Sequence, residues 1–600
     1  MPLYKAPLRD MKFVLHEMLQ AEKNYQTFPA FADQVNQDII NQYLQAAADF
    51  CENEIAPLNQ SGDQEGCHLN QGVVTTPKGF KEAHQKYAEL GFPSLTADPT
   101  YGGQGMPTLL RIAISEMLCG SNWSWAMYQG LSHGAMRTLE HHGTEQQKQT
   151  FLTKLVAGIW TGTMCLTESH AGSDLGLIRT KAEPQPDGSY HITGEKIFIS
   201  AGEHDLAENI IHIVLARLPN APAGTKGISL FIVPKFNVNE SGELLDRNQV
   251  VCNAIEHKMG IHGNATCVMN FDAAKGFLIG PENRGLNCMF TFMNTARIGT
   301  AVQGLAASQM AFQGALDYAK DRLAMRALSG AKYPDKNADP IIVHPAVRSM
   351  LMTQKAFAEG GRALVYFLAH HADIVEHSEN EQQKHASDEL LAFLTPIAKA
   401  FLTESGNESA KHGVQIFGGH GFIVEHGMEQ IVRDARISSL YEGTTEIQSL
   451  DLLARKVLKS NGKLLKNMTD LIDQFVIENQ SNTDLKIYLD QLSKLKTEWL
   501  EITQYIANNA KQSPEEIGAA SVDYLYYSSY IVFAFLWARM AKIALEKLDE
   551  GTSEDKFYQA KLRTAQFFYD KLLNRTQQHV ASIKTGAASV MALDAEDFAF

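Results

Sequence analysis

The stretch SLYEGTTEIQSL, residues 439–450, places one carboxylate, Glu442, between an aromatic residue and a glycine. Thr445 and Gln448 have the spacing of a capping box, so we expect a helix to begin there and Glu442 to lie just outside it, on a loop. Taken alone, the stretch leaves two interpretations open. Glu442 is either a catalytic carboxylate or an ordinary acidic residue favoured by the dipole at a helix start.

The composition is that of a large folded protein with several domains. The chain has 600 residues, of which 44% are hydrophobic and 20% are charged, and its formal net charge is −15. This charge excludes a general electrostatic footprint for nucleic acid or an anionic membrane. The seven cysteines are scattered and form no CxxC pair, which predicts no metal site and reduced thiols in a cytosolic or matrix-like compartment; we expect a cytoplasmic location.

Two features bear on targeting. No secretory signal is apparent at the start of the sequence, because charges interrupt every apolar run there. The longest apolar run, YIVFAFLWA at residues 530–538, is about half of the roughly 20 residues that a membrane-spanning helix needs. We therefore expect a buried helix in this segment and no transmembrane segment.

The periodicity of apolar residues divides the chain into four segments. Residues 1–160 have helical spacing, residues 161–280 contain short β-rich runs, and residues 281–460 and 461–600 are again helical. Within the β segment, HITGEKIF predicts a hairpin with its turn at Thr193-Gly194. There is no βαβ alternation and no GxGxxG, so a Rossmann fold is disfavoured and the fold class is α+β, mainly α.

Two further segments are ambiguous when each is taken alone. MCLTESHAGSDLG, residues 164–176, is either a nest of backbone N–H groups for a phosphate or heteroaromatic ring, or an ordinary polar loop. QIFGGHGF, residues 415–422, allows close backbone approach to a ligand or is simply a helix C-cap followed by a turn.

The order and spacing of these segments together are far more specific. Over residues 80–458, YGGQG, LTE with AGSD, GEKIFIS, KMGIHG, MNTAR, QIFGGHGF, RDARI and YEGTTEIQ follow the order seen in the acyl-CoA dehydrogenase family of flavoproteins, which the chain closely resembles. The extension after residue 460 resembles the long-form branch of the family. The resemblance implies an N-terminal helical domain, a central β domain, a C-terminal four-helix bundle and an additional C-terminal helical domain.

The resemblance also implies a reaction. Family members remove the α proton of an acyl-CoA thioester while a hydride leaves the β carbon for N5 of FAD, which gives a trans-2-enoyl-CoA. Glu442 matches the base, and its own backbone N–H would bind the thioester oxygen together with a flavin ribityl hydroxyl. Some members carry the base immediately before the arginine of the motif matching MNTAR. Here that residue is Ala296, which cannot accept a proton.

For the cofactor, the resemblance identifies one set of residues around the flavin and its phosphates and another that reaches the FAD of a neighbouring subunit. The first set is Met164, Leu166, Thr167, Gly172, Ser173, Phe198, Ile199 and Ser200, with Thr444 and Glu446 after the base. The second set is Arg322, Gln415, Gly418 and Gly419. FAD shared between subunits implies a homo-oligomer, most simply a dimer.

The resemblance also implies contacts with the CoA substrate. These residues are Ser173, Asn294, Arg297, Gly443 and Arg455, with Tyr441 lining the acyl pocket. Arg297 has an alternative role in a structural ion pair. His170 stands where many members have glycine, and no role is assigned to it.

The implied partners are an acyl-CoA and an electron-transfer flavoprotein, in fatty acid β-oxidation and lipid metabolism. The acyl group stays open between 3-(methylthio)propanoyl, medium-chain and long-chain groups. An acyl-CoA oxidase is one alternative. A DNA-binding damage-response flavoprotein of the same fold is another, and the 15 basic against 19 acidic residues of segment 461–600 disfavour it.

Overall fold

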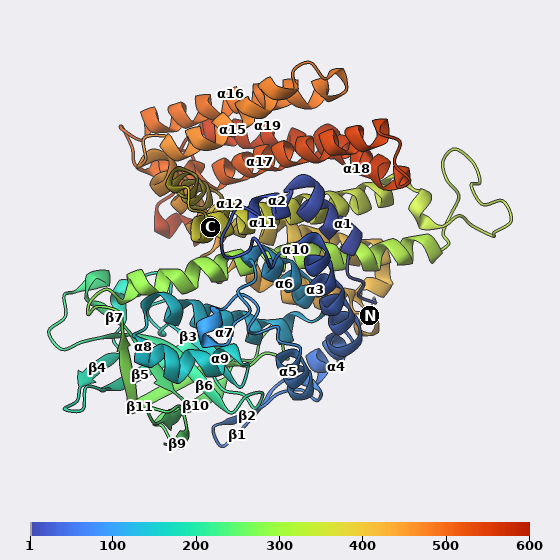
Figure 1. Cartoon of the computed structure of the whole chain (residues 1–600). Coiled ribbons are helices and arrows are strands. Elements are labelled where there is room, and N and C mark those ends of the chain that lie inside the picture. Colours follow the sequence, from blue (N-terminus) through green and yellow to red (C-terminus); the bar gives the residue numbers. More distant parts are fainter. Residues whose placement is uncertain (1–2, 600) are drawn as a thin grey trace. The chain divides into compact units, whose positions relative to one another are not determined.

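The computed structural model describes residues 3–599, which form two compact units (Figure 1). Residues 3–6 and 42–299 form one of them, the sheet unit. Residues 7–41 and 300–599 form the other, the helical unit. The division falls inside two helices, α3 (Gln37–Phe50) and α10 (Gly285–Asp321).

The sheet unit is built on a seven-stranded sheet in the order β10-β11-β5-β4-β6-β3, with β7 paired to both β11 and β6. Its strands are β3 (Trp160–Cys165), β4 (Lys181–Pro184), β5 (Tyr190–Ser200), β6 (Asn209–Arg217), β7 (Ile228–Pro234), β10 (Val250–Ile255) and β11 (Thr266–Ile279). Strand β3 runs parallel to β6, whereas β5, β7 and β10 run antiparallel to β11. Two small ladders lie outside this sheet, β1 (His68–Asn70) with β2 (Val73–Thr75) and β8 (Phe236–Val238) with β9 (Leu244–Arg247).

Strand β6 is buried on both faces, in keeping with its largely apolar sequence, NIIHIVLAR. Ile211 and Ile213 pack into one core cluster, and Val214 and Ala216 pack into the other. The helices of this unit are α4 (Leu58–Glu65), α5 (Phe80–Glu89), α6 (Thr108–Ser121), α7 (Trp123–His142), α8 (Glu145–Gln147) and α9 (Thr153–Val156). Helix α7 shares the first cluster with the sheet, so the end of β3 has a rigid support.

The predicted hairpin at Thr193-Gly194 is wrong. Both residues lie inside β5, which continues from Tyr190 to Ser200. Glycine is needed there because a Cβ at Gly194 would lie 2.5 Å from the side-chain Oγ1 of Thr180 and 2.9 Å from its Cα. The irregularity falls on the partner strand instead, where the register of β11 shifts between Phe271 and Ala274.

The helical unit contains long helices that pack side by side. They are α1 (Leu8–Lys12), α2 (Ala21–Tyr25), the end of α10, α11 (Pro345–His377), α12 (Glu381–Phe417), α13 (Met428–Arg436), α14 (Thr445–Leu450), α15 (Lys463–Asn479), α16 (Lys486–Asn509), α17 (Glu515–Asp549), α18 (Asp555–Phe567) and α19 (Thr576–Thr585). Helices α10 and α12 cross closely at two glycines. A Cβ on Gly304 would lie 2.3 Å from the Leu402 carbonyl oxygen, and one on Gly406 would lie 2.7 Å from the Gly304 oxygen.

The predicted fold class is confirmed: helices, a central sheet, then helices, with additional helices at the C-terminus. The apolar run at residues 530–538 is buried in α17, as expected. Among the described residues, α17 is the one helix that is long and apolar enough to cross a membrane, and 78% of its most apolar window is buried in the structure. It is therefore the core helix of the C-terminal segment.

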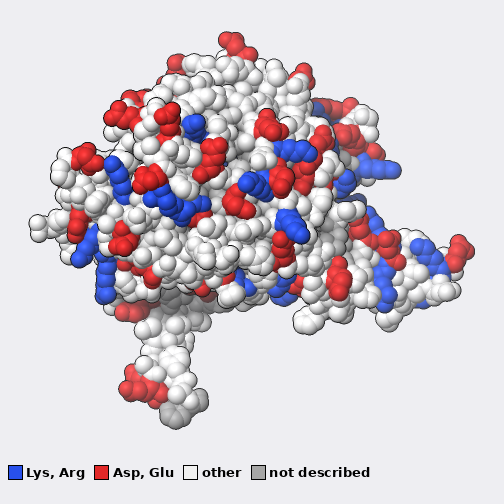
Figure 2. Space-filling view, turned by 90° about the horizontal axis from the view of Figure 1, so that it is seen from below, with Lys and Arg blue, Asp and Glu red and all other residues white. Residues whose placement is uncertain are grey.

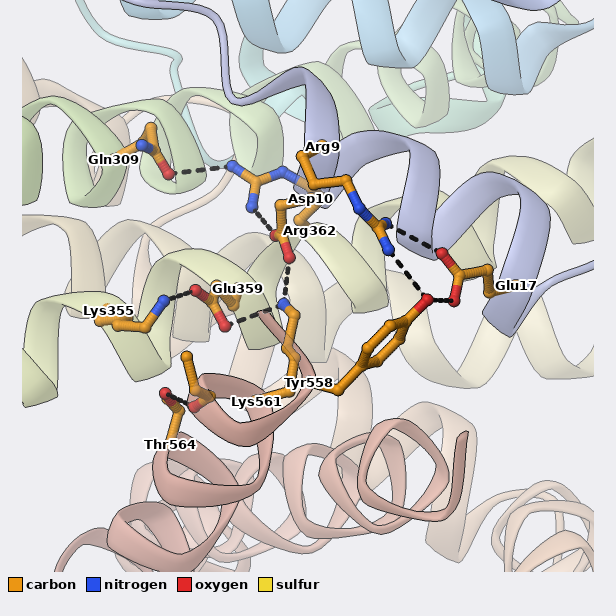
Figure 3. A network of polar contacts seen from close by, with 11 residues as sticks. Arg9, Asp10, Glu17, Gln309, Lys355, Glu359, Arg362, Tyr558, Lys561 and Thr564 are labelled. Carbon is orange, nitrogen blue, oxygen red and sulfur yellow. Dashed lines mark hydrogen bonds and ion pairs between the residues drawn. The ribbon is translucent and has the colours of Figure 1, made fainter. Parts of the chain in front are cut away.

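A buried ionic network ties the C-terminal segment to the bundle and to the N-terminal helix (Figure 3). Asp10 of α1 accepts hydrogen bonds from Lys561 of α18 and Arg362 of α11, and all three residues are buried. Lys561 also donates to Glu359 at 2.8 Å. Arg362 reaches Gln309 of α10 at 3.0 Å. Three segments far apart in the sequence therefore share one cluster of charges.

The electrostatics of this network favour the ionised form of Asp10. Burial alone would raise the pKa of Asp10, but the charges of Lys561 and Arg362 lower it to about 2. A carboxylate whose pKa is lower in the folded state than in the unfolded state stabilises the fold above its unfolded pKa of about 4. That stabilisation is lost as the pH falls toward 2.

We expect Lys561→Met to destabilise the protein by about 3 kcal/mol or more, because the substitution leaves Asp10 and Glu359 with less compensation for their burial. Chemical denaturation at pH 7 measures this loss. The difference from the unsubstituted protein should shrink as the pH falls from about 4 toward 2, because protonation of Asp10 over this range removes the same interaction.

Lys556→Met is the matched control, since Lys556 is an exposed lysine of the same helix. It should change stability by less than about 0.5 kcal/mol. Equal small losses in both variants, at every pH, would show that the network does not hold the C-terminal segment.

Candidate active site

Glu442 lies in the helical unit on a tight turn between the short helix Ile437–Ser439 and α14. Its φ is +56°, and that of Gly443 is +91°, so two consecutive residues adopt left-handed backbone conformations. Only glycine does so without cost, and a residue such as glutamate loses of order 1–3 kcal/mol there. Backbone strain of this kind is concentrated at functional sites, and it falls here on the residue that the sequence singles out.

Two buried side chains bind the carbonyl groups of this turn. Lys399 Nζ, from the middle of α12, donates to the Gly443 oxygen at 2.6 Å, and Gln448 Nε2, from α14, donates to the Glu442 oxygen at 2.9 Å. Neither side chain is exposed to solvent. The hydroxyl of Tyr441 donates to Gln303 of α10. The turn is thus held from three helices.

The start of α14 differs from the prediction. The N-cap is Thr444, whose Oγ1 accepts from the Ile447 N–H at 3.3 Å, and the predicted capping box of Thr445 and Gln448 is wrong. The helix begins one residue earlier than expected because Gln448 is used to bind the Glu442 carbonyl. Thr445 instead donates to Glu404 of α12 at 2.6 Å. Glu446 is exposed in the first turn.

In the sheet unit, the segment after β3 is organised by a buried ion pair. Glu168 and Ala171 exchange two backbone hydrogen bonds, which closes a tight turn. The Glu168 carboxylate accepts from Lys196 Nζ at 2.8 Å and from the Thr180 hydroxyl at 2.6 Å. Burial alone would raise the pKa of Glu168, but the charge of Lys196 and these hydrogen bonds lower it to about 2. His170 contacts the Leu177 carbonyl at 3.1 Å, so it also closes this segment.

Phe198 is aimed out of the sheet by a bulge. Cys267 and Met269 of β11 pair with Ile199 and Lys196, so that two residues of β5 oppose one of β11. Phe198 has a φ of +59° and a side chain that is 60% exposed. The adjacent Ile197 N–H donates to the Thr167 carbonyl at 2.9 Å. An exposed aromatic residue therefore lies one residue from the point where β5 contacts the backbone of Thr167, just after the end of β3.

The remaining residues predicted around the flavin fall into two classes. The side chains of Leu166 and Ile199 pack into the core clusters, with Met164 packed against one of them, so any contact of Leu166 or Ile199 with a cofactor falls to the main chain. Gly172 and Ser173 are exposed, and within residues 3–599 their N–H groups have no hydrogen-bond partner. Ser200 is partly buried, and its carbonyl accepts from Thr163 at 2.7 Å.

The residues predicted to reach the FAD of a second subunit gather in the helical unit. Arg322 follows the end of α10 and Gln415 lies in the last turn of α12, and both are exposed. A Cβ on Gly418 or Gly419 would have no atom within 4 Å. The ring of Tyr318 in α10 stacks on Phe417, with 4.0 Å between centroids. This stacking fixes the end of α12 against α10, next to the glycines.

The predicted CoA contacts are spread over both units. Gly443 lies in the turn with Tyr441, and Arg455 is exposed and pairs with Asp451 at 3.5 Å. Asn294 and Ser173 of the sheet unit are exposed. Arg297 makes no ion pair within residues 3–599, and its Nε is buried without a hydrogen-bond partner there. Within the described residues of one chain, nothing therefore supports the alternative of a structural ion pair for Arg297.

Several contributing residues were not identified from the sequence. Lys399 and Lys196 are buried lysines inside apolar stretches, TPIAKAF and GEKIFIS, and that mismatch is the signal that marks them. Asp339 is fully buried and accepts from the N–H groups of Ala327 and Tyr333 at 3.0 and 2.8 Å, which orders the loop after Arg322. No group of three potential metal ligands occurs among the residues that the structure describes.

Each unit, taken by itself, carries residues that fit part of an FAD. An exposed aromatic ring beside a threonine suits an isoalloxazine edge, and the unpaired N–H groups of Gly172 and Ser173 suit an anionic or polar group. The exposed guanidinium of Arg322 and the open space at Gly418 and Gly419 suit a pyrophosphate.

Comparison with known proteins agrees with the fold and with the fit of these residues to FAD. The N-terminal, middle and C-terminal domains of acyl-CoA dehydrogenase match residues 39–159, 163–274 and 283–458, and an acetyl-CoA dehydrogenase C-terminal-like domain matches residues 464–594. The chain is 39% identical over 573 residues to 3-methylmercaptopropionyl-CoA dehydrogenase of Ruegeria pomeroyi, covering 95% of this chain and 96% of that one. It is 35% identical to a broad-specificity linear acyl-CoA dehydrogenase of Mycobacterium tuberculosis, covering 99% and 100%.

Two solved structures share the fold over nearly the whole chain. Caenorhabditis elegans ACDH-11, solved in complex with C11-CoA, has a TM-score of 0.76 at 19% identity and covers 95% of this chain and 91% of that one. The acyl-CoA dehydrogenase of Bacillus anthracis, complexed with FAD, has a TM-score of 0.73 at 21% identity with the same coverage. The motifs, the fold and the close relatives agree, and the chain belongs to the acyl-CoA dehydrogenase family of FAD-dependent enzymes.

Proposed function

We propose that this acyl-CoA dehydrogenase uses Glu442 to remove the α proton of its acyl-CoA substrate, and that the product is the trans-2-enoyl-CoA. The observation that carries the proposal is the strained, firmly held turn at Glu442. When bound, FAD supplies the acceptor for the hydride that leaves the β carbon. The protein's own part is to hold the carboxylate at the α carbon and to bind the thioester oxygen.

A carboxylate is suited to this task because an apolar acyl chain displaces water from around it, which makes it a stronger base. Glu442 is already partly buried, so little water has to be removed. The alternative base position of the family is filled by Ala296, which has no proton acceptor in its side chain. These two facts favour Glu442.

For the substrate, 3-(methylthio)propanoyl-CoA is our first candidate. Support comes from the relative of Ruegeria pomeroyi, which is named for this acyl group and spans nearly the whole chain. The mycobacterial relative is named for linear acyl groups, so short and medium straight-chain thioesters are the second choice. Arg297, whose Nε is buried without a partner within residues 3–599, is a candidate contact for the CoA moiety.

We further propose that the enzyme is a cytoplasmic homo-oligomer, most simply a dimer, that passes electrons to an electron-transfer flavoprotein in acyl-CoA β-oxidation. In the helical unit, Met325, Leu328 and Phe422 are 79%, 96% and 83% exposed, near Arg322 and Gln415 in the sequence. Large apolar side chains exposed to this extent favour an interface with a second subunit.

A DNA-binding role is not supported. On the face drawn in Figure 2, basic and acidic side chains are interspersed and no basic stripe runs across it. Segment 461–600 has 15 basic against 19 acidic residues, so it offers no favourable field for a phosphate backbone.

The direct test is to mix the purified yellow enzyme, without oxygen, with a series of acyl-CoAs. We expect bleaching of the flavin absorbance with 3-(methylthio)propanoyl-CoA and with short or medium straight-chain thioesters. Failure of every acyl-CoA to bleach the flavin would contradict the proposed reaction. Peroxide formation during aerobic turnover would instead identify an oxidase.

Glu442→Gln should lower the rate of flavin reduction by about 10²- to 10⁴-fold, because the amide cannot accept the proton. Stopped-flow absorbance measures this rate, and the FAD content of the variant should be unchanged. Glu381→Gln, an equally conservative change at an exposed glutamate of α12, should react at the normal rate. A Glu442→Gln variant with most of its activity would exclude Glu442 as the base.

The strain at Glu442 predicts an effect on stability that is separate from catalysis. Glu442→Gly and Glu442→Ala both remove the carboxylate, but only glycine adopts a φ of +56° without cost. We therefore expect the glycine variant to be about 1 kcal/mol more stable than the alanine variant in thermal or urea unfolding. An alanine variant that is as stable as the glycine variant would show that the turn is not strained.

A further inference from the structure

Two buried polar side chains beside the catalytic turn have no part in the chemistry described above. Lys399 lies in the apolar stretch LTPIAKAFL, residues 394–402 of α12, and Gln448 lies in the second turn of α14. Both have no solvent exposure. Burying an ammonium group is costly unless it gains a strong, well-directed hydrogen bond, so the position of Lys399 calls for an explanation.

The two side chains bind consecutive carbonyl groups. Gln448 Nε2 holds the oxygen of Glu442 at 2.9 Å, and Lys399 Nζ holds the oxygen of Gly443 at 2.6 Å. In a trans peptide the C=O and the next N–H point in opposite directions. The two contacts therefore set the orientation of both peptide planes that follow Glu442, including the N–H groups of Gly443 and Thr444.

The packing leaves this turn little freedom. A Cβ at Gly443 would lie 2.5 Å from Gln448 Nε2 and 3.4 Å from the side chain of Ile447, so the glycine is required by both its conformation and its surroundings. The strain in the left-handed residues must be offset by interactions that exist only in this arrangement. The hydrogen bonds from Lys399 and Gln448 are such interactions.

We propose that Lys399 and Gln448 are positioning residues: by binding the carbonyls of Gly443 and Glu442 they hold the strained turn and thereby fix where the Glu442 carboxylate lies. The inference rests on the proposed role of Glu442 as the base. The two residues act through the backbone that carries the base.

The consequence for catalysis is specific. Proton removal from carbon is sensitive to the position of the base, and a displacement of about 1 Å costs on the order of 100-fold in rate. Loss of either hydrogen bond should therefore slow proton removal while leaving the surfaces for CoA and FAD in place. A residue with a merely structural role would lower stability without changing the step that limits the rate.

The experiment uses the full-length enzyme with FAD and compares Lys399→Met and Gln448→Met with the unsubstituted protein. We expect kcat to fall about 10- to 100-fold in each variant, with KM for the acyl-CoA unchanged within about threefold. The isotope effect on flavin reduction with a substrate carrying two deuterium atoms at the α carbon should rise, because proton removal becomes more rate-limiting. The double variant should lose less than the product of the two single losses, because both residues hold one turn.

Lys384→Met, at a partly exposed lysine near the start of α12, is the matched control and should retain normal kinetics. Normal kcat and isotope effect in Lys399→Met and Gln448→Met would overturn the inference, and so would failure of both variants to fold with FAD, which would assign them a structural role. If only one variant fails to fold, the other decides. If the unsubstituted enzyme bleaches with no acyl-CoA, the proposed function fails instead, so the two failures are distinguishable.

Discussion

The candidate active site of this protein depends on a turn that the backbone would not adopt unaided. Glu442 and Gly443 are both left-handed, and the turn is held by hydrogen bonds from Lys399 and Gln448 to consecutive carbonyls. The long helices of the helical unit support this turn. Helix α12 brings Lys399 to it, and the close crossing of α10 and α12 at Gly304 and Gly406 fixes the two helices that support it. The turn is therefore a product of the packing around it rather than of its own sequence.

The C-terminal segment packs against the helix that follows the turn. Ser521 of α17 contacts Ser449 of α14 at 3.1 Å in the buried interior of the helical unit, so the added domain lies directly behind the helix that follows the base. The network of Asp10, Arg362 and Lys561 fastens that domain to α1 and α11. A buried ionic cluster adds little net stability compared with a well-packed apolar one, but removing one partner is costly because it leaves a buried charge uncompensated. The segment thus supports the bundle from which the catalytic turn projects.

The sequence predicted the architecture well because its signals are local and ordered. The change from helical to alternating periodicity marks the sheet. The order of the short motifs identifies the family, and the prediction of Glu442 and of the FAD residues rests on that family. The predictions that were wrong concerned features that tertiary contacts determine. TG in HITGEKIF looks like a turn, but Gly194 is needed because Thr180 approaches it across the sheet. Gln448 looks like part of a capping box, but its amide is taken by a carbonyl six residues earlier.

The residues that the sequence did not reveal share one property. Their partners are backbone groups that the fold brings to them from elsewhere in the sequence, as for Lys399, Lys196 and Asp339. One amino-acid sequence alone does not indicate those partners. Conversely, Phe198 was identified as a flavin contact by resemblance, but the bulge that turns it outward depends on the register of β5 against β11. The sequence thus indicates which residues are candidates for the site, but it does not indicate how their side chains are oriented.

The turn held by Lys399 and Gln448 places Glu442 for proton removal, and α-proton exchange tests this placement without the second half of the reaction. An acyl-CoA analogue with sulfur in place of the β carbon has no β hydrogen, so it cannot lose a hydride, yet its α protons remain exchangeable. In deuterated water, mass spectrometry should show deuterium entering the α carbon with the unsubstituted enzyme, at least tenfold more slowly with Lys399→Met, and not measurably with Glu442→Gln. Exchange at the unsubstituted rate in Lys399→Met would contradict a role of Lys399 in placing Glu442.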